Sequence, residues 1–270
     1  MLFFIGKNWI NILNKNLLLD LKNEKVKKIY NVSSLSIELL LDYFKINKKI
    51  YIIPMLECDM ILLNKYNIPN IGPNIDIVKT FMSKKEFYNY VVINSLENHI
   101  PETYNKLEDI NENKILILKP FNLNFGQGMK IIKKEDILNE YFEKYIIQEY
   151  IQDNSEYVIH IIAKEGKIIH YFCYQYKILD IENSEIFIRT KEFSDKHKIE
   201  LIKHKLSQDN LDIFEKFLLP CKYTGPCNFD FKYQNKQIKV LEINPRLGGS
   251  LMFDQNRQDL CFFINKLLDL

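Results

Sequence analysis

Apolar and polar residues alternate in two different ways along this chain. In the first 80 residues, short apolar runs such as 2–6 and 48–56 are separated by stretches with helical spacing, such as 36–44. Strands that alternate with helical segments predict βαβ units and a parallel sheet. We therefore expect a small Rossmann-like domain over residues 1–80, without the GxGxxG sequence that a dinucleotide site would need.

The rest of the chain predicts antiparallel strands and amphipathic helices, and hence a mixed α/β fold. The turn at Glu165-Gly166 predicts that the segments on either side of it, 155–163 and 167–176, pair as a hairpin. Further strands are expected at 114–119, 130–132 and 145–151, and helices at 77–98, 136–144, 198–219 and 258–270.

The most informative pattern predicts a β-hairpin near the C-terminus. Two apolar-alternating runs, 228–233 and 238–243, are joined by the turn-like sequence Gln234-Asn235-Lys236. The second run leads into Asn-Pro-Arg-Leu-Gly-Gly-Ser, which ends at Ser250. An ordinary hairpin needs neither an arginine nor a glycine pair directly after its second strand, so this tail indicates a functional site.

Three oxygen-bearing side chains belong to the predicted hairpin. Asp230 lies on the first strand, and Glu242 and Asn244 lie two residues apart on the second, where they share one face. Two carboxylates and an amide oxygen suit Mg²⁺, which completes its shell with water and substrate phosphates. Arg246 follows and can bind phosphate or carboxylate oxygens bidentately. The pattern predicts a magnesium-phosphate site; the alternative is an ordinary hairpin with solvated acids.

A second phosphate-binding pattern lies earlier in the chain. Lys119 ends the apolar run 114–119 and is followed by a loop that contains Gly126 and Gly128. A lysine at the end of a buried strand can place its ammonium against phosphate oxygens, while backbone N–H groups of a glycine-bearing loop approach from the other side. This sequence is not a Walker motif, and an ordinary hairpin turn is the alternative.

Composition and charge limit the range of partners. The net charge of +2, with 27% charged residues, indicates neither a nucleic-acid-binding nor a membrane-binding surface. No apolar run reaches the roughly 18 residues expected of a membrane-spanning helix. The five cysteines lack metal-like spacing, and the first residues lack the charged segment and cleavage site of a signal peptide. We expect reduced cysteines in a cytoplasmic protein.

The sequence Leu-Glu-Ile-Asn-Pro-Arg, with Gly-Pro-Cys-Asn-Phe-Asp-Phe before it, resembles the metal-binding strand pair of the ATP-grasp superfamily. It is most similar to the branch with carbamoyl-phosphate-synthase-like and carboxylate-amine ligase domains. The resemblance implies a Rossmann-like domain over residues 1–80 and an ATP-grasp domain over 81–270. The two ATP-grasp subdomains, about 81–147 and 148–270, would hold ATP between them, with Mg²⁺, or Mn²⁺ as an alternative, on Asp230, Glu242 and Asn244.

The resemblance also implies which residues bind the nucleotide phosphates. A lysine near the start of the helix after residue 80 would reach them, and Lys84 has the closest spacing, with Lys79 and Lys85 left open. Lys119 would be the second phosphate lysine, and Gly126 and Gly128 would belong to the loop that covers the phosphates.

The resemblance places the base and ribose at the connector between the two subdomains. Gln148 stands where many relatives carry glutamate, and the backbone of Glu149 and Ile151 would pair with the adenine edge. Glu156 would bind the ribose hydroxyls. Lys177 and an arginine at 189 could meet phosphate or a substrate carboxylate, or lie at solvated strand ends.

The reaction implied by the resemblance couples ATP hydrolysis to bond formation between a small-molecule carboxylate and an amine. Lys119 and Arg246 would stabilise charge during phosphoryl transfer. Other acceptor chemistry, such as carbamoyl phosphate formation or phosphoryl transfer, ranks lower because the sequence shows no tandem duplication. The second hypothesis, from another class, is a catalytically silent nucleotide-binding module. A homodimer is left open.

Overall fold

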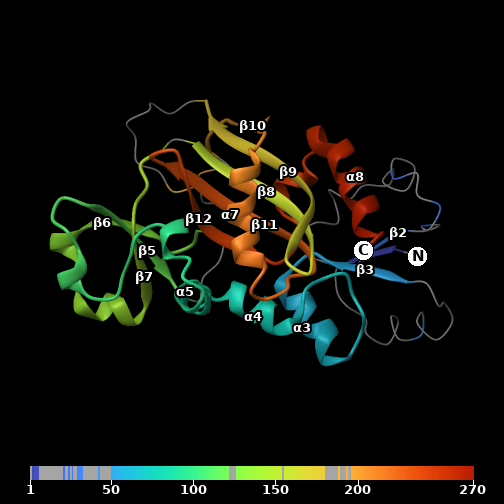
Figure 1. The fold of residues 1–270 in the computed structure, drawn as a ribbon, viewed down its shortest axis with the longest axis horizontal. Coiled ribbons are helices and arrows are strands. Elements are labelled where there is room, and N and C mark those ends of the chain that lie inside the picture. Colours follow the sequence, from blue (N-terminus) through green and yellow to red (C-terminus); the bar gives the residue numbers. More distant parts are fainter. Residues whose placement is uncertain are drawn as a thin grey trace.

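Three separate β-sheets organise this computed structural model, which describes residues 2–5, 21, 24, 26, 29–32, 42, 50–121, 126–153, 155–179, 188, 193 and 196–270. A parallel sheet comes from the N-terminal segment. A small antiparallel sheet and a larger antiparallel sheet follow it in the chain. In Figure 1 the larger sheet lies in the centre, with the small sheet at one end of the molecule and the N-terminal sheet at the other.

The N-terminal sheet is parallel, as the alternation of strands and helical segments predicts. Its order is β2 (Ile29–Val32), β1 (Leu2–Ile5) and β3 (Tyr51–Pro54), and helix α3 (Glu57–Lys65) follows β3. Leu2, Phe3, Ile52 and Ile53 are buried, which fits the continuous apolar runs of strands covered on both faces. The predicted helical run at 36–44 lies outside the described residues apart from position 42.

Two helices connect the N-terminal sheet to the small sheet. Ser83 ends helix α4 (Ile75–Met82) and begins helix α5 (Lys84–Ile93), and its Oγ accepts a hydrogen bond of 3.3 Å from the Glu86 N–H. An N-cap serine satisfies one of the free N–H groups of the first turn. The break at Ser83 divides the predicted helical segment into two and places Lys84 at the very start of α5.

The small sheet presents two different faces. Its strand order is β4 (Thr103–Tyr104), β7 (Tyr145–Glu149), β5 (Ile115–Pro120) and β6 (Lys130–Lys133), all antiparallel. Leu116, Leu118 and Ile147 pack into one hydrophobic cluster on one face. Because side chains alternate along a strand, Lys119 and Gln148 lie on the opposite face.

The predicted helix at 136–144 is wrong in type. The chain there forms two short 3₁₀ turns, η3 (Lys134–Asp136) and η4 (Asn139–Glu143). Ile137 between them is extended, with φ −78° and ψ 127°, and its side chain is buried in the small-sheet cluster. The chain is therefore not helical at Ile137, where the side chain packs into the small-sheet cluster. Two further 3₁₀ turns, η1 (Glu97–His99) and η2 (Leu107–Asp109), flank β4.

The larger sheet has five antiparallel strands. Its order is β10 (Ile199–Lys203), β9 (Lys167–Ile178), β8 (Ser155–Lys164), β11 (Gly225–Gln234) and β12 (Gln237–Asn244). The predicted hairpins, β8–β9 and β11–β12, are both present. The predicted helix at 198–219 is wrong at its start, because Ile199–Lys203 forms an edge strand that pairs with β9, and helix α7 (Gln208–Leu218) begins only after Ser207.

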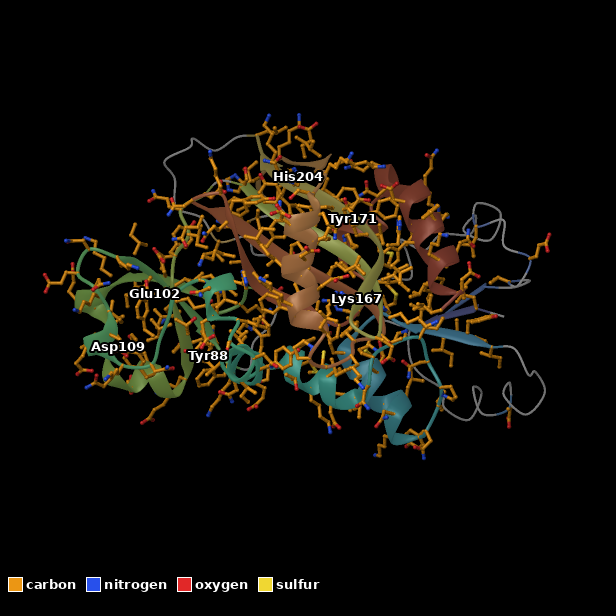
Figure 2. All side chains as sticks on the ribbon, viewed as in Figure 1. Tyr88, Glu102, Asp109, Lys167, Tyr171 and His204 are labelled. Atoms are coloured by element: carbon orange, nitrogen blue, oxygen red, sulfur yellow. The ribbon has the colours of Figure 1, made fainter. Side chains whose placement is uncertain are left out.

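Helices cover both faces of the larger sheet. Helix α7 crosses one face (Figure 1), where the Phe214 ring lies 5.1 Å from Phe229 and 5.2 Å from Phe231 between centroids. Lys167 at the start of β9, labelled in Figure 2, lies beside this helix and donates to Glu215 at 2.8 Å. Helix α8 (Arg257–Leu267) packs on the other face, in a cluster that includes residues of the N-terminal sheet.

Candidate functional site

A β-bulge decides which side chains of the β11–β12 hairpin face away from α7. Asp230 pairs with Glu242, but the next residue of β11 pairs with Val240, so Leu241 is an extra residue on β12. Val240 before the bulge and Ile243 after it both pack on the α7 side. The extra residue shifts the alternation by one, and Glu242 therefore lies on the face opposite α7.

The hairpin brings together the three side chains that the sequence singled out as metal ligands. Asn244 Nδ2 donates to Glu242 Oε1 at 3.2 Å, and Asp230 pairs with Glu242 in register. Burial raises the pKa of Glu242, but hydrogen bonds with Asp230 and Asn244 and nearby positive charges outweigh it and hold that pKa below its ordinary value. Two carboxylates this close repel each other unless a proton or a cation lies between them.

The oxygen set fits a hard divalent cation. Asp230 and Glu242 supply carboxylates, and Asn244 supplies an amide oxygen. Within the described part of the chain, no group of three or more His, Cys, Asp or Glu side chains is placed to hold a metal ion. Two carboxylates with an amide are nevertheless enough for Mg²⁺, which normally keeps water and phosphate oxygens in its remaining positions.

Arg246 is buried beside these ligands and reaches back to the N-terminal segment. Its Nη2 lies 3.4 Å from Asn244 Oδ1, and its Nη1 donates to the Leu247 carbonyl at 3.0 Å. Its Nε lies 2.9 Å from Glu57 Oε1, and Glu57 is the first residue of α3. Asn228 Nδ2 donates to the Arg246 carbonyl at 3.1 Å. A network of short contacts therefore fixes the guanidinium next to the hairpin acids.

Two lysines approach the hairpin acids from outside the larger sheet. Lys84 begins α5, and Lys119 lies on β5 of the small sheet. Both of their charges lower the pKa of Glu242. Burial lowers the pKa of Lys84, and the Glu242 charge opposes that shift. The structure therefore brings Lys84, and not the exposed Lys79 or Lys85, to the acids.

Lys119 is more deeply buried than Lys84, with 8% of its surface exposed. Burial lowers its pKa to about 8, assisted by the charges of Lys84 and Lys232, while Glu242 and Glu156 act in the opposite direction. A buried ammonium with these neighbours is poised for an additional anion, because negative charge would offset the loss of hydration.

The loop after β5 is described only in part. Gly126 and Gly128 have positive φ values of 71° and 67°, which glycine adopts without a steric penalty. Residues 122–125 lie outside the described residues. Backbone N–H groups near residues with positive φ can form anion-binding concavities. The conformation of the two glycines is therefore compatible with a phosphate-binding loop, which stays a prediction.

The connector between the two antiparallel sheets runs from β7 to β8. Gln148, on the same face of the small sheet as Lys119, donates from Nε2 to Thr103 Oγ1 at 2.9 Å. The Glu149 N–H donates to the Glu102 carbonyl at 2.8 Å, and the Ile151 carbonyl accepts from the Asp153 N–H at 3.0 Å. The Glu156 charge reaches Lys119. Glu156, which lies on β8 directly after the connector, is therefore near Lys119.

The sequence also offered Lys177 and Arg189 as contacts to phosphate or a substrate carboxylate. Lys177 is exposed near the end of β9, where it pairs in register with Glu200 of the edge strand. Position 189 lies outside the described residues.

Sequence reasoning missed four residues of the site. Asn228 and Lys232 flank Asp230 at intervals of two on β11, so the alternation that selected Asp230 could have found them. Glu57 and His160 are brought in only by the fold. His160 lies on β8 and is fully buried, with Nε2 2.8 Å from Ser250 Oγ. Burial, and then Arg246, lower the pKa of His160 to about 3, so its ring is neutral at physiological pH.

Helix α5 and the small sheet thus bring Lys84 and Lys119 to an acidic hairpin, an arrangement whose charges suit phosphate and a divalent cation. A family model described as an ATP-grasp domain matches residues 84–250. The chain therefore belongs to the ATP-grasp family, as the hairpin motif predicted.

Solved structures show the same fold over the whole chain. D-alanine–D-alanine ligase from Bacillus anthracis aligns with a TM-score of 0.64 at 17% identity, covering 99% of this chain and 94% of that one. L-amino acid ligase from Bacillus licheniformis aligns at 0.62 and 14%, covering 99% and 73%. Biotin carboxylase from Campylobacter jejuni aligns at 0.62 and 13%, covering 99% and 70%. No curated protein sequence matches the chain.

Helices of the described residues are too short or too polar to cross a membrane.

Proposed function

We propose that this protein is an ATP- and Mg²⁺-dependent ligase that activates a substrate carboxylate as an acyl phosphate for attack by an amine. One observation carries the proposal: Lys84 and Lys119 approach from outside the larger sheet and lower the pKa of Glu242 on its hairpin. Cations suited to phosphate and acids suited to a metal thus converge. The fold likeness to two amino-acid ligases supports the same reaction class.

In this proposal the hairpin residues Asp230, Glu242 and Asn244 hold Mg²⁺, with Mn²⁺ as an alternative. The bound metal would neutralise and orient the β- and γ-phosphate oxygens. The hydrogen bond from Asn244 Nδ2 to Glu242 would orient the carboxylate. Asp230, which pairs with Glu242, would bind the same metal ion. The cation would then take the place of a proton between the two carboxylates.

Three cations would bind the phosphates from the remaining sides. Lys84 and Lys119 would hold the oxygens of the triphosphate, with the backbone at Gly126 and Gly128 above them. Arg246, fixed by Glu57 and Asn244, would face the γ-phosphate as its charge is transferred. Catalysis would consist of positioning and charge stabilisation, so no nucleophilic side chain is required.

The connector would bind the base and ribose. The backbone at Glu149 and Ile151 would pair with the adenine edge beside Gln148, and Glu156 would accept hydrogen bonds from the ribose hydroxyls. The Glu156 charge already acts on Lys119, which supports a ribose position next to the phosphate lysine.

The bond changes of the proposed reaction are simple. An oxygen of the substrate carboxylate attacks the γ-phosphorus of ATP, the bond to the β-phosphate oxygen breaks, and ADP leaves. The amine nitrogen then attacks the acyl carbon, loses a proton, and displaces inorganic phosphate. The backbone at 248–250 would receive the substrate carboxylate, because it lies beside Arg246.

We also propose the division of the chain into domains at 1–80 and 81–270, with subdomains of about 81–147 and 148–270. The first unit contributes Glu57 to the site, so it would take part in substrate selection. A cytoplasmic location belongs to the same proposal, and a homodimer is left open.

The fold likeness to biotin carboxylase supports a second candidate with a different acceptor, such as carbamoyl phosphate formation or simple phosphoryl transfer. ADP release with Mg²⁺, measured against a panel of amino acids and small carboxylates, separates the two. Release that needs both a carboxylate and an amine, with formation of their amide, supports the ligase. Release with one acceptor alone supports the second candidate. A chain that binds MgATP and releases no ADP is a silent module.

Gly248→Ala is expected to lower turnover about tenfold or more without unfolding the protein. An added Cβ would lie 2.4 Å from His160 Cε1 and 2.9 Å from Asn228 Cγ, and His160 is fully buried. The backbone at 248–250 would therefore move, and small displacements of substrate-positioning groups are costly. ADP release at saturating MgATP tests this.

The matched control for this change is Gly72→Ala. The nearest atom to an added Cβ at Gly72 is Oδ1 of the half-buried Asn70, at 2.9 Å, and this side chain can rotate. We expect near-normal turnover. Equal losses in the two variants would show that residues 248–250 have no special place in the reaction.

A further inference from the structure

A buried lysine holds the connector from the side of the metal-binding hairpin. Lys232 lies on β11 and has 5% of its surface exposed. Its Nζ donates to the Asp153 carbonyl at 2.7 Å and to the Ile151 carbonyl at 3.2 Å. The same ammonium lies 5.3 Å from the centroid of the Tyr150 ring. One cation thus makes contacts along most of the described connector.

Lys232 lies on the same face of the larger sheet as Asp230. Asp230 and Lys232 are two residues apart, while Phe231 between them packs on α7. Side chains two apart share a face of the sheet, so Lys232 points to the same side as the acid proposed to hold the metal. The charge of Lys232 also contributes to the environment of Lys119. A single strand therefore carries a metal-site acid and the group that fixes the connector.

A simpler side chain would suffice if only volume had to be filled. A buried ammonium is costly unless its donors are satisfied, and here backbone carbonyls of the connector accept from it. Hydrogen bonds from a charged donor are stronger and more directional than an apolar contact. Methionine could occupy similar space, but it could not bind the two carbonyls.

We propose that Lys232 is a positioning residue that ties the connector to the metal-binding hairpin, and so sets the nucleotide base in register with its phosphates. The inference rests on the nucleotide site of the proposed function and adds a residue to it. Lys232 acts through the connector backbone. Its loss should weaken binding of the base while the phosphate half of the site is kept.

Two probes separate these halves. Isothermal titration would compare MgATP with magnesium tripolyphosphate, which has the charged chain and no base. We expect Lys232→Met to weaken MgATP binding about tenfold or more and to leave tripolyphosphate binding within about twofold. Lys232→Arg keeps the charge and the donors, and should restore part of the MgATP affinity.

Lys239→Met is the matched control. Lys239 lies opposite Lys232 in the hairpin register and also donates to a backbone carbonyl, that of Asn98 at 2.8 Å. This contact lies outside the connector, so MgATP affinity should stay near that of the unmodified protein. Circular dichroism would verify that each variant is folded, and Lys232→Gln replaces Lys232→Met if the methionine variant unfolds.

Three results would overturn the proposal. Equal weakening of both probes by Lys232→Met would show that the lysine acts on the phosphates by its charge. Unchanged affinity for both probes would show that the connector is held without it. If the unmodified protein binds neither probe, the nucleotide site itself is wrong and the proposed function fails with it. In the first two cases the proposed function stands.

Discussion

Glu242→Gln should reduce Mg²⁺-dependent ADP release at least about a thousandfold while the protein stays folded. Glutamine has nearly the same shape, and its amide can keep contact with Asn244, but it has no negative charge for a divalent cation. It would also leave the charges of Lys84 and Lys119 without the acid whose pKa they lower. Loss of metal-borne charge stabilisation in phosphoryl transfer is among the largest single effects in such sites.

The measurement for Glu242→Gln is ADP release under saturating MgATP, with the melting temperature as a check on folding. Glu200→Gln is the control, because Glu200 is an exposed acid on the edge strand of the same sheet. Its activity should equal that of the unmodified protein. ADP release by Glu242→Gln at the normal rate would remove Glu242 from the proposed metal site.

Lys119→Met should weaken MgATP binding about a hundredfold and remove a pH dependence that the unmodified protein shows. Burial lowers the Lys119 pKa to about 8, so the side chain is a cation below pH 8 and loses its proton as the pH rises through that value. Only the cation attracts phosphate. MgATP affinity should therefore fall as the pH rises above 8, by at most about tenfold per pH unit for one proton.

Titrations of MgATP binding from pH 7 to 10 test both parts of the Lys119 prediction. The Lys119→Met variant should show a flatter profile in this window. Lys85→Met is the control, since Lys85 is exposed and its Nζ lies over the Phe121 ring at 5.8 Å. It should bind MgATP as the unmodified protein does. A steep profile that persists in Lys119→Met would assign the titration to another group.

The hairpin could be predicted because its information is local. Alternation on either side of 234–236 indicated two strands, and Asn235 and Lys236 have the positive φ values of 51° and 65° that a tight hairpin turn requires. The motif around Asp230 and Glu242 then pointed to the family. The alternation of buried and exposed side chains involves residues that are close together in the chain, so it can be read directly from the sequence.

Features that depend on distant partners could not be predicted in the same way. The segment Ile199–Lys203 is a strand because β9 offers it hydrogen-bonding partners, and this tertiary effect overrides its local pattern. The sequence favoured Lys84 over its neighbours only by spacing within the family, and its electrostatic interaction with Glu242 appears only in the fold. The contact of Arg246 with Glu57 joins distant parts of the chain, so no local sequence pattern predicts it.

Because of the extra residue at Leu241, the arrangement of side chains on β12 depends more on the number of residues in the strand than on which residue stands at position 241. Substituting Leu241 changes one half-buried side chain. Removing it would restore strict alternation and exchange the two sides of β12 beyond that point. Ile243 would then turn toward the face proposed to hold magnesium, and Glu242 would turn toward the phenylalanines that pack on α7. In proteins that descend from this sequence, we therefore expect insertions and deletions between Asp230 and Asn244 to be rarer than amino-acid replacements at Leu241.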